Sequence, residues 1–182
     1  MVQSVELLLD DALDGAVRRQ WDRLAAAGLP SQARHPGASN RPHVTLTVST
    51  VPWSAAVEAA LADAVIGSLP LAVRLGAPLV FAPGPRCVLA RLVVPSPALL
   101  ALHARIHAAA AEPDRAPGGV PHTAPGEWTP HVTLARGLPV ARLGEAVAAL
   151  GEATPGHVPD APGRAVGARR WDGDARRAWR LG

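Results

Sequence analysis

Apolar residues along the first half of the chain alternate between two spacings. Residues 4–9 form an apolar run typical of a buried strand, and Leu13, Val17, Trp21 and Leu24 follow at helical spacing before Gly28 ends the pattern. Ser54 is placed to cap a second helix. The pattern predicts strand, helix, loop, strand, helix and strand, at residues 4–9, 11–27, 28–42, 43–49, 54–66 and 71–82.

The second half of the chain repeats this order. Apolar runs and Pro/Gly-rich breaks predict strand, helix, loop, strand and helix at residues 86–94, 97–111, 112–130, 131–136 and 140–150. Residues 163–182 predict two further strands joined at Asp172-Gly173, a dipeptide that favours a hairpin turn. Two similar units therefore follow one another in one chain.

Both units contain the pentapeptide Pro-His-Val-Thr-Leu, at residues 42–46 and 130–134. Each copy occupies the same place in its unit, so an internal duplication explains the identity better than chance does. Alternate residues of a strand point to the same face, so the histidine and threonine of each copy share a face. If the two units pair about a pseudo-twofold axis, both His–Thr pairs face one cleft.

Two imidazoles across a cleft suit attack on a phosphorus centre. One proton must leave the nucleophile and another must reach the departing oxygen, and a histidine pKa of about 6.5 allows one neutral and one protonated ring near neutral pH. Threonine hydroxyls can donate hydrogen bonds to the phosphoryl oxygens, where charge accumulates. This chemistry needs no metal, and we expect no cofactor.

Composition excludes several enzyme classes. All 18 Lys+Arg side chains are arginine, so a P-loop, an adenylated-lysine ligase and a Schiff-base enzyme are ruled out. The formal net charge is only +3, but residues 164–182 hold six arginines against two aspartates. That cluster can meet phosphates, or it can simply keep an edge hairpin from pairing with other sheets.

Three features favour a cytoplasmic protein. No segment is apolar enough to span a bilayer, the N-terminus lacks a basic stretch before an apolar run, and Cys87 is the one cysteine. We expect a monomer without a membrane partner.

With "PHVTL" at 42–46 and "WTPHVTLAR" at 128–136, the chain resembles the 2H phosphoesterase superfamily, named for two His-x-Thr/Ser-x motifs. Within it, the chain looks most similar to the bacterial 2′-5′ RNA ligase and RNA 2′,3′-cyclic phosphodiesterase group. The resemblance implies an α+β fold in one domain, residues 1–182, made of two pseudo-symmetric lobes. Two antiparallel sheets would flank a central groove, with helices outside.

The resemblance also implies an activity, the hydrolysis of 2′,3′-cyclic phosphates of nucleotides or RNA ends to 2′-phosphates, with reversible 2′-5′ RNA ligation as a related reaction. Its partner would be an RNA end or a nucleotide 2′,3′-cyclic phosphate. The implied roles are general acid for His43, general base for His131, phosphate binding for Thr45, Thr133 and Arg136, and base stacking for Trp128. Val48 stands where the first motif would match Arg136.

Other interpretations remain open from the sequence. The chain could be an RNA- or nucleotide-binding module without turnover, or a cyclic phosphodiesterase for a non-RNA metabolite. The two motif histidines could hold a metal, although no third ligand has a telling spacing. His103 and His107 share a helix face without the glutamate of a metalloprotease motif, and His35 and His122 lie in the loops before the motifs.

Overall fold

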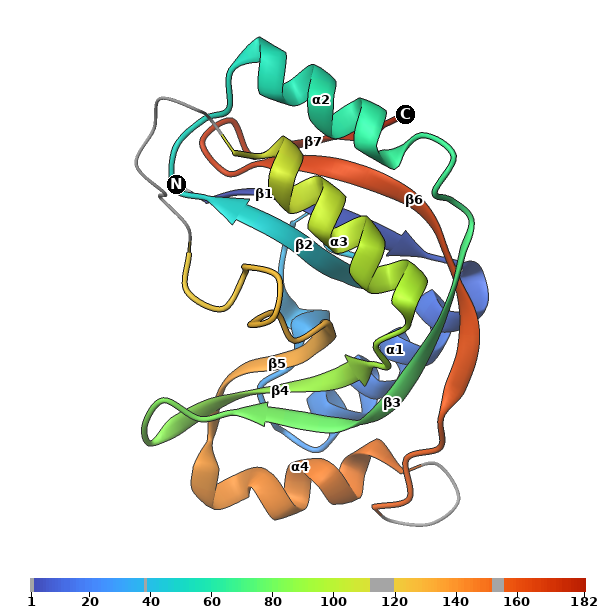
Figure 1. Cartoon of the computed structure of the whole chain (residues 1–182). Helices are drawn as coiled ribbons and strands as arrows, with labels where there is room; N and C mark the ends of the chain where they lie inside the picture. Colours follow the sequence, from blue (N-terminus) through green and yellow to red (C-terminus); the bar gives the residue numbers. More distant parts are fainter. Residues whose placement is uncertain (1, 38, 112–119, 152–155) are drawn as a thin grey trace.

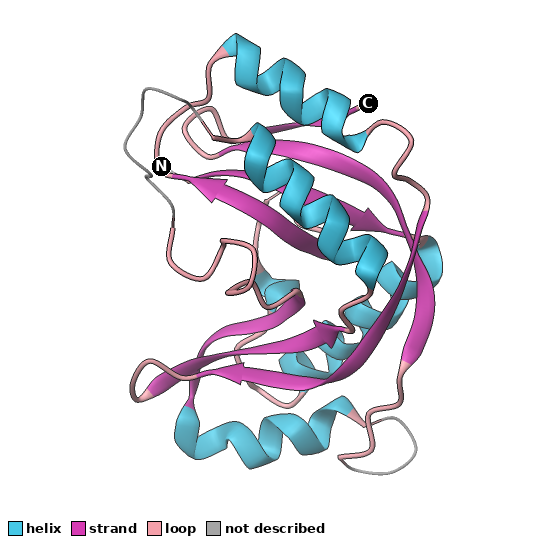
Figure 2. Cartoon of the chain, viewed as in Figure 1, coloured by secondary structure: helices cyan, strands magenta, loops and turns pink. Residues whose placement is uncertain are grey.

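The computed structural model describes residues 2–37, 39–111, 120–151 and 156–182 (Figures 1 and 2). Two short 3-10 helices, η1 and η2, cover Gln32–Arg34 and Val140–Arg142. The other elements are β1 (Gln3–Leu9), α1 (Asp11–Ala26), β2 (His43–Ser49), α2 (Ala55–Val65), β3 (Leu71–Phe81), β4 (Arg86–Val93), α3 (Pro97–Ala109), β5 (His131–Pro139), α4 (Leu143–Leu150), β6 (Ala161–Asp172) and β7 (Arg177–Leu181).

The predicted order of elements is confirmed. The Ser54 side chain caps α2 by accepting a hydrogen bond from the Val57 backbone N–H. The C-terminal hairpin is also present, but its turn spans residues 173–176 and is longer than the two-residue turn that Asp172-Gly173 predicts. Residues 112–119 of the second predicted loop lie outside the described residues.

The strands form one seven-stranded antiparallel sheet in the order β2-β1-β6-β3-β4-β5, with β7 also paired to β6. The expectation of two separate sheets is therefore corrected. The sheet is continuous because β6 is long, with 12 residues. Its C-terminal part pairs with β1 and its N-terminal part with β3, so the hydrogen-bonded ladder runs through without a break.

This strand order is symmetric. If β1, β2 and β3 are exchanged with β4, β5 and β6, the same order results, read from the other end. A duplicated unit predicts such an order. The two motif strands, β2 and β5, are the end strands of this path. The sheet curves, and the curvature brings β2 and β5 close to each other (Figure 1).

Each helix that follows a unit's first strand packs against the motif strand of the other unit. Helix α1 contacts β5 and α4, whereas α3 contacts β2 and α2. The apolar face predicted for α1 is buried, with Leu13, Val17, Trp21 and Leu24 all in the core. No helix in the described part of the chain is both long and apolar enough to cross a membrane.

Two indole N–H groups hold the motif strands in place. Trp21 on α1 donates to the backbone carbonyl of Thr133 on β5, and Trp128, just before β5, donates to the carbonyl of Thr45 on β2, each at 3.0 Å. Both acceptors are the motif threonines. The backbone of each motif strand is therefore fixed by a tryptophan that comes from outside that strand.

Trp21→Phe tests this support, because it removes the donor and leaves the Thr133 carbonyl without it. We expect the free energy of unfolding, measured by urea denaturation, to fall by about 1–3 kcal/mol. The matched control is Trp171→Phe, at a half-buried tryptophan whose indole has no hydrogen-bond partner among the described residues. Equal losses in both variants would show that the indole bond to β5 contributes nothing.

Candidate active site

The motif side chains alternate as predicted. In β2, Val44 and Leu46 are fully buried, whereas His43 and Thr45 are only half-buried on the opposite face. In β5, Val132 and Leu134 are buried in the same way, and the histidine and threonine between them are again half-buried. The valines and leucines anchor each strand in the core, so the polar pair has a fixed direction.

A pocket of about 450 Å³ lies between these polar faces. It is lined by both motif threonines, by His43 and by Arg136. The structure thus brings together four of the six residues that the sequence proposes for the site. His131 lies beside this pocket, two residues before Thr133 on the same face of β5, with its ring against Phe81 at a centroid distance of 4.8 Å.

Both motif histidines are held by the same backbone contact. Nδ1 of His43 lies 2.8 Å from the carbonyl of Arg41, and Nδ1 of His131 lies 2.8 Å from the carbonyl of Thr129. A carbonyl oxygen can only accept, so Nδ1 carries the proton in each ring. In the neutral ring Nε2 is then the basic nitrogen, and in the imidazolium Nε2–H is an acid.

A buried carboxylate faces His43. In the sheet register, Glu6 of β1 is paired with Thr45 on one side and with Arg169 of β6 on the other. Its Oε1 lies 3.7 Å from Nε2 of His43, and its Oε2 accepts from Nε of Arg169 at 2.7 Å. Burial raises the pKa of Glu6, but the charges of His43 and Arg169 and a hydrogen bond from Ser4 outweigh this effect and hold it below the ordinary 4.5. Glu6 is therefore ionised near neutral pH.

His131 has no such carboxylate across the strand. The residue paired with Thr133 on β4 is Ala90, at the place that Glu6 occupies beside Thr45. Burial lowers the pKa of His131 below its ordinary 6.5, and the charges of Arg136 and His43 lower it further, although the hydrogen bond to Thr129 opposes them. The neutral imidazole is thus favoured at this position.

One face of the Trp128 ring is covered by another side chain of the protein. Its ring stacks on His103 of α3, with centroids 4.0 Å apart and planes within 1°, while its N–H bonds to β2. It is absent from the lining of the pocket between the motif strands, so its predicted contact with a base is untested.

The remaining histidines divide between structure and surface. His103 is buried, and its Nε2 lies 3.0 Å from the carbonyl of Thr123, so it is a packed residue. His35 lines the pocket between the motif strands, whereas His122 is exposed. Over the described ranges, no group of three or more histidine, cysteine or acidic side chains is placed to hold a metal ion.

The sequence did not single out Glu6, and it gave Arg169 only as one of six arginines near the C-terminus. The signal for Glu6 was present, because it is the one charged residue in the apolar run at residues 4–9 and a buried carboxylate needs a partner. The partner could not be found in this way, since Arg169 is 163 positions away and only the pairing of β1 with β6 brings the two together.

Comparison with known proteins agrees with this architecture. Residues 13–171 match the family model described as the 2′-5′ RNA ligase superfamily. A search of curated proteins finds no match.

Among solved structures, E. coli LigT complexed with NADP+ is 21% identical with a TM-score of 0.54, covering 98% of this chain and 91% of its own. E. coli LigT complexed with 3′-AMP is 16% identical with a TM-score of 0.54, covering 98% and 96%. A crystal structure described as a phosphoesterase is 20% identical with a TM-score of 0.52, covering 98% and 92%. At these identities the likeness shows a shared fold.

The family match covers most of the chain and includes both His-x-Thr strands that line the groove. The chain belongs to the 2′-5′ RNA ligase superfamily.

Proposed function

We propose that the protein is a metal-independent phosphodiesterase that opens 2′,3′-cyclic phosphates of nucleotides or RNA ends to 2′-phosphates. The observation that carries this proposal is the pair of histidines on facing strands. Both are locked through Nδ1 onto a backbone carbonyl, so that both Nε2 atoms serve as acid or base.

The environments of the two rings support one assignment of the roles. An imidazolium at His43 faces the ionised Glu6, so His43 suits the general acid. Burial of the His131 ring, and the nearby charges of Arg136 and His43, lower its pKa and favour its neutral form, so it suits the general base. This is the assignment that the family resemblance implies, reached here from the unequal neighbours of two similar motifs.

The proposed reaction forms one bond to phosphorus and breaks another. Nε2 of His131 accepts a proton from water, and the water oxygen forms a bond to phosphorus. The bond between phosphorus and the ribose 3′ oxygen breaks, and Nε2–H of His43 protonates that oxygen, which leaves a 2′-phosphate. The hydroxyls of Thr45 and Thr133 and the guanidinium of Arg136 stabilise the charge on the phosphoryl oxygens.

A nucleotide substrate agrees with the ligands of structural relatives, because E. coli LigT has been crystallised with 3′-AMP and with NADP+. In ligation, the 5′-hydroxyl of another RNA end takes the place of water: His131 accepts its proton, its oxygen bonds to phosphorus, and the bond from phosphorus to the 3′ oxygen breaks as His43 protonates that oxygen. The strain of the cyclic phosphate drives the formation of the 2′-5′ linkage, so no ATP is needed. Water is in large excess, so hydrolysis is the expected main direction.

His43→Ala and His131→Ala test the reaction class. We expect each to lower the rate of 2′,3′-cyclic AMP hydrolysis in EDTA by roughly 10²- to 10⁴-fold while ligand binding is kept. Product analysis should show the 2′-phosphate for the native protein. His157→Ala, at an exposed histidine outside the pocket, is the matched control and should retain full activity. Tight binding without turnover in the native protein would instead indicate a binding module.

The pH dependence of kcat/KM tests the role of His131. A base must be neutral, so activity should fall as the pH drops through the pKa of His131, and the acid limb should lie below 6.5 because burial lowers that pKa. Phe81→Ala opens the surroundings of the ring and should move the acid limb to higher pH. If the acid limb does not move in Phe81→Ala, that limb reports the ionisation of a group other than His131.

Glu6→Gln tests the role of His43. The substitution keeps the shape and a hydrogen-bond acceptor for Arg169 but removes the charge that faces the imidazolium. We expect kcat/KM for 2′,3′-cyclic AMP to fall, because the charge that faces the acid is lost, while the acid limb of the pH profile is unchanged. A shift of the acid limb alone would reverse the assignment of acid and base. Urea denaturation of the same variant separates this effect from a loss of stability.

A further inference from the structure

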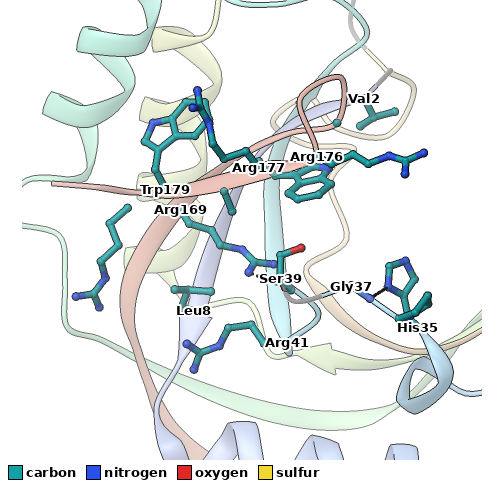
Figure 3. A pocket seen from close by; sticks show the side chains of 15 residues that line it. Val2, Leu8, His35, Gly37, Ser39, Arg41, Arg169, Arg176, Arg177 and Trp179 are labelled. Atoms are coloured by element: carbon teal, nitrogen blue, oxygen red, sulfur yellow. Dashed lines mark hydrogen bonds between the residues drawn. The ribbon is translucent and has the colours of Figure 1, made fainter.

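A second pocket, of about 1190 Å³, adjoins the pocket between the motif strands. The C-terminal hairpin β6–β7 forms one side of it and the loop before β2 forms the other (Figure 3). The two pockets share six lining residues, so they are contiguous: Val2, His35, Ser39, Arg41, Arg169 and Trp171.

The second pocket is strongly cationic. Five arginines line it, and none of its described lining residues is an aspartate or glutamate. Two of the five have carboxylate partners, since Arg41 pairs with Asp14 and Arg169 with Glu6. The other three, Arg176, Arg177 and Arg180, are exposed and have no ion-pair partner among the described residues. Three guanidinium groups are thus available to an anion.

Tryptophans lie among these arginines. Trp171 lines both pockets, at their junction, and Trp179 lines the second. The guanidinium of Arg177 lies 5.4 Å from the Trp179 ring centroid, and that of the buried Arg170 lies 5.5 Å from it. Alternating cationic and aromatic side chains in a groove are what single-stranded nucleic acid requires, because phosphates and bases alternate along it.

The hairpin is anchored rather than loose. Arg170 of β6 donates to Glu58 of α2 at 2.8 Å and to Gln3 of β1 at 2.5 Å, and it lies 4.3 Å from the ring centroid of Trp53. This wall of the pocket is therefore held in a fixed position before a ligand arrives, and little ordering is needed on binding.

Charge on an edge hairpin also prevents pairing with other sheets, and among the strands that the structure describes β7 is paired to β6 alone. Preventing such pairing requires only that the charges are exposed. It does not require the charges to line a concave surface that is free of carboxylates and continuous with a site for phosphate chemistry.

We propose that this second pocket, the hairpin pocket, binds the phosphodiester backbone of an RNA end whose terminal cyclic phosphate lies between His43 and His131. The proposal rests on the proposed function. A 2′,3′-cyclic phosphate occupies the 3′ side of the last ribose, so the chain can continue only through the 5′ oxygen of that nucleotide. The hairpin pocket then takes the phosphates on the 5′ side, and the preferred substrate is an oligonucleotide rather than a mononucleotide.

The test compares two substrates, 2′,3′-cyclic AMP and an RNA tetranucleotide that ends in adenosine 2′,3′-cyclic phosphate. The test variant is Arg176→Gln/Arg177→Gln, which removes two exposed charges and keeps the side-chain length. Its matched control is Arg164→Gln, at an exposed arginine on β6 that lines neither pocket.

We expect the native protein to prefer the tetranucleotide in kcat/KM. The double variant should lose at least about tenfold on the tetranucleotide, because charge-assisted contacts to phosphate are removed. On cyclic AMP it should stay within about twofold, because exposed charges outside the site are screened by salt. The slope of log kcat/KM against log salt for the tetranucleotide should become shallower by about 1.4 for two lost phosphate contacts.

Two results would overturn the proposal. One is equal kcat/KM for both substrates in the native protein with no loss in the double variant. The other is the same loss on both substrates, which would mean that the hairpin acts only on the catalytic pocket.

Failure of the proposed function gives a different result, namely no turnover of either substrate by the native protein. Fluorescence anisotropy with a labelled tetranucleotide that ends in a 3′-phosphate then decides on the hairpin pocket alone. Binding that weakens by about tenfold in the double variant and not in Arg164→Gln supports the pocket. Equal binding by all three proteins overturns it.

Discussion

Two strands at opposite ends of one sheet must face each other, and the site depends on this constraint. Because β6 pairs with both β1 and β3, the sheet is continuous and its curvature sets the approach of β2 to β5. The indoles of Trp21 and Trp128 then fix the motif backbones. Each indole belongs to one unit and bonds to the motif strand of the other unit. We propose on this basis that residues 1–182 form one domain of two interlocked units.

Nearly identical motifs have different electrostatic neighbours. The row Thr45–Glu6–Arg169 across β2, β1 and β6 is polar and charged, whereas the corresponding row across β5, β4 and β3 is Thr133–Ala90–Leu79. A buried carboxylate remains ionised when a cation accompanies it, and it then favours a positive charge beside it. The duplication supplies two histidines, and divergence of one cross-strand position makes them unequal.

The sequence predicts the elements and the paired histidines well, because apolar spacing and a repeated pentapeptide are local signals. It predicts the sheet less well. Pro162 and Gly163 resemble strand breakers but lie inside β6, where a Cβ on Gly163 would come within 2.5 Å of Leu13 on α1. The expectation of two separate sheets comes from the family resemblance, and the pairing of β6 with both β1 and β3 corrects it. The contact of Glu6 with His43 and the pocket beside the hairpin also depend on long-range strand pairing, which spacing along the chain does not encode.

We propose that His43 acts as the acid and His131 as the base. A direct test uses a nucleoside 4-nitrophenyl phosphodiester, whose leaving group needs little protonation, beside a 2′,3′-cyclic phosphate. We expect His43→Ala to recover much of its lost activity on the nitrophenyl ester, whereas His131→Ala should remain inactive on both substrates. Recovery by His131→Ala instead, or equal losses by both variants on both substrates, would contradict this assignment.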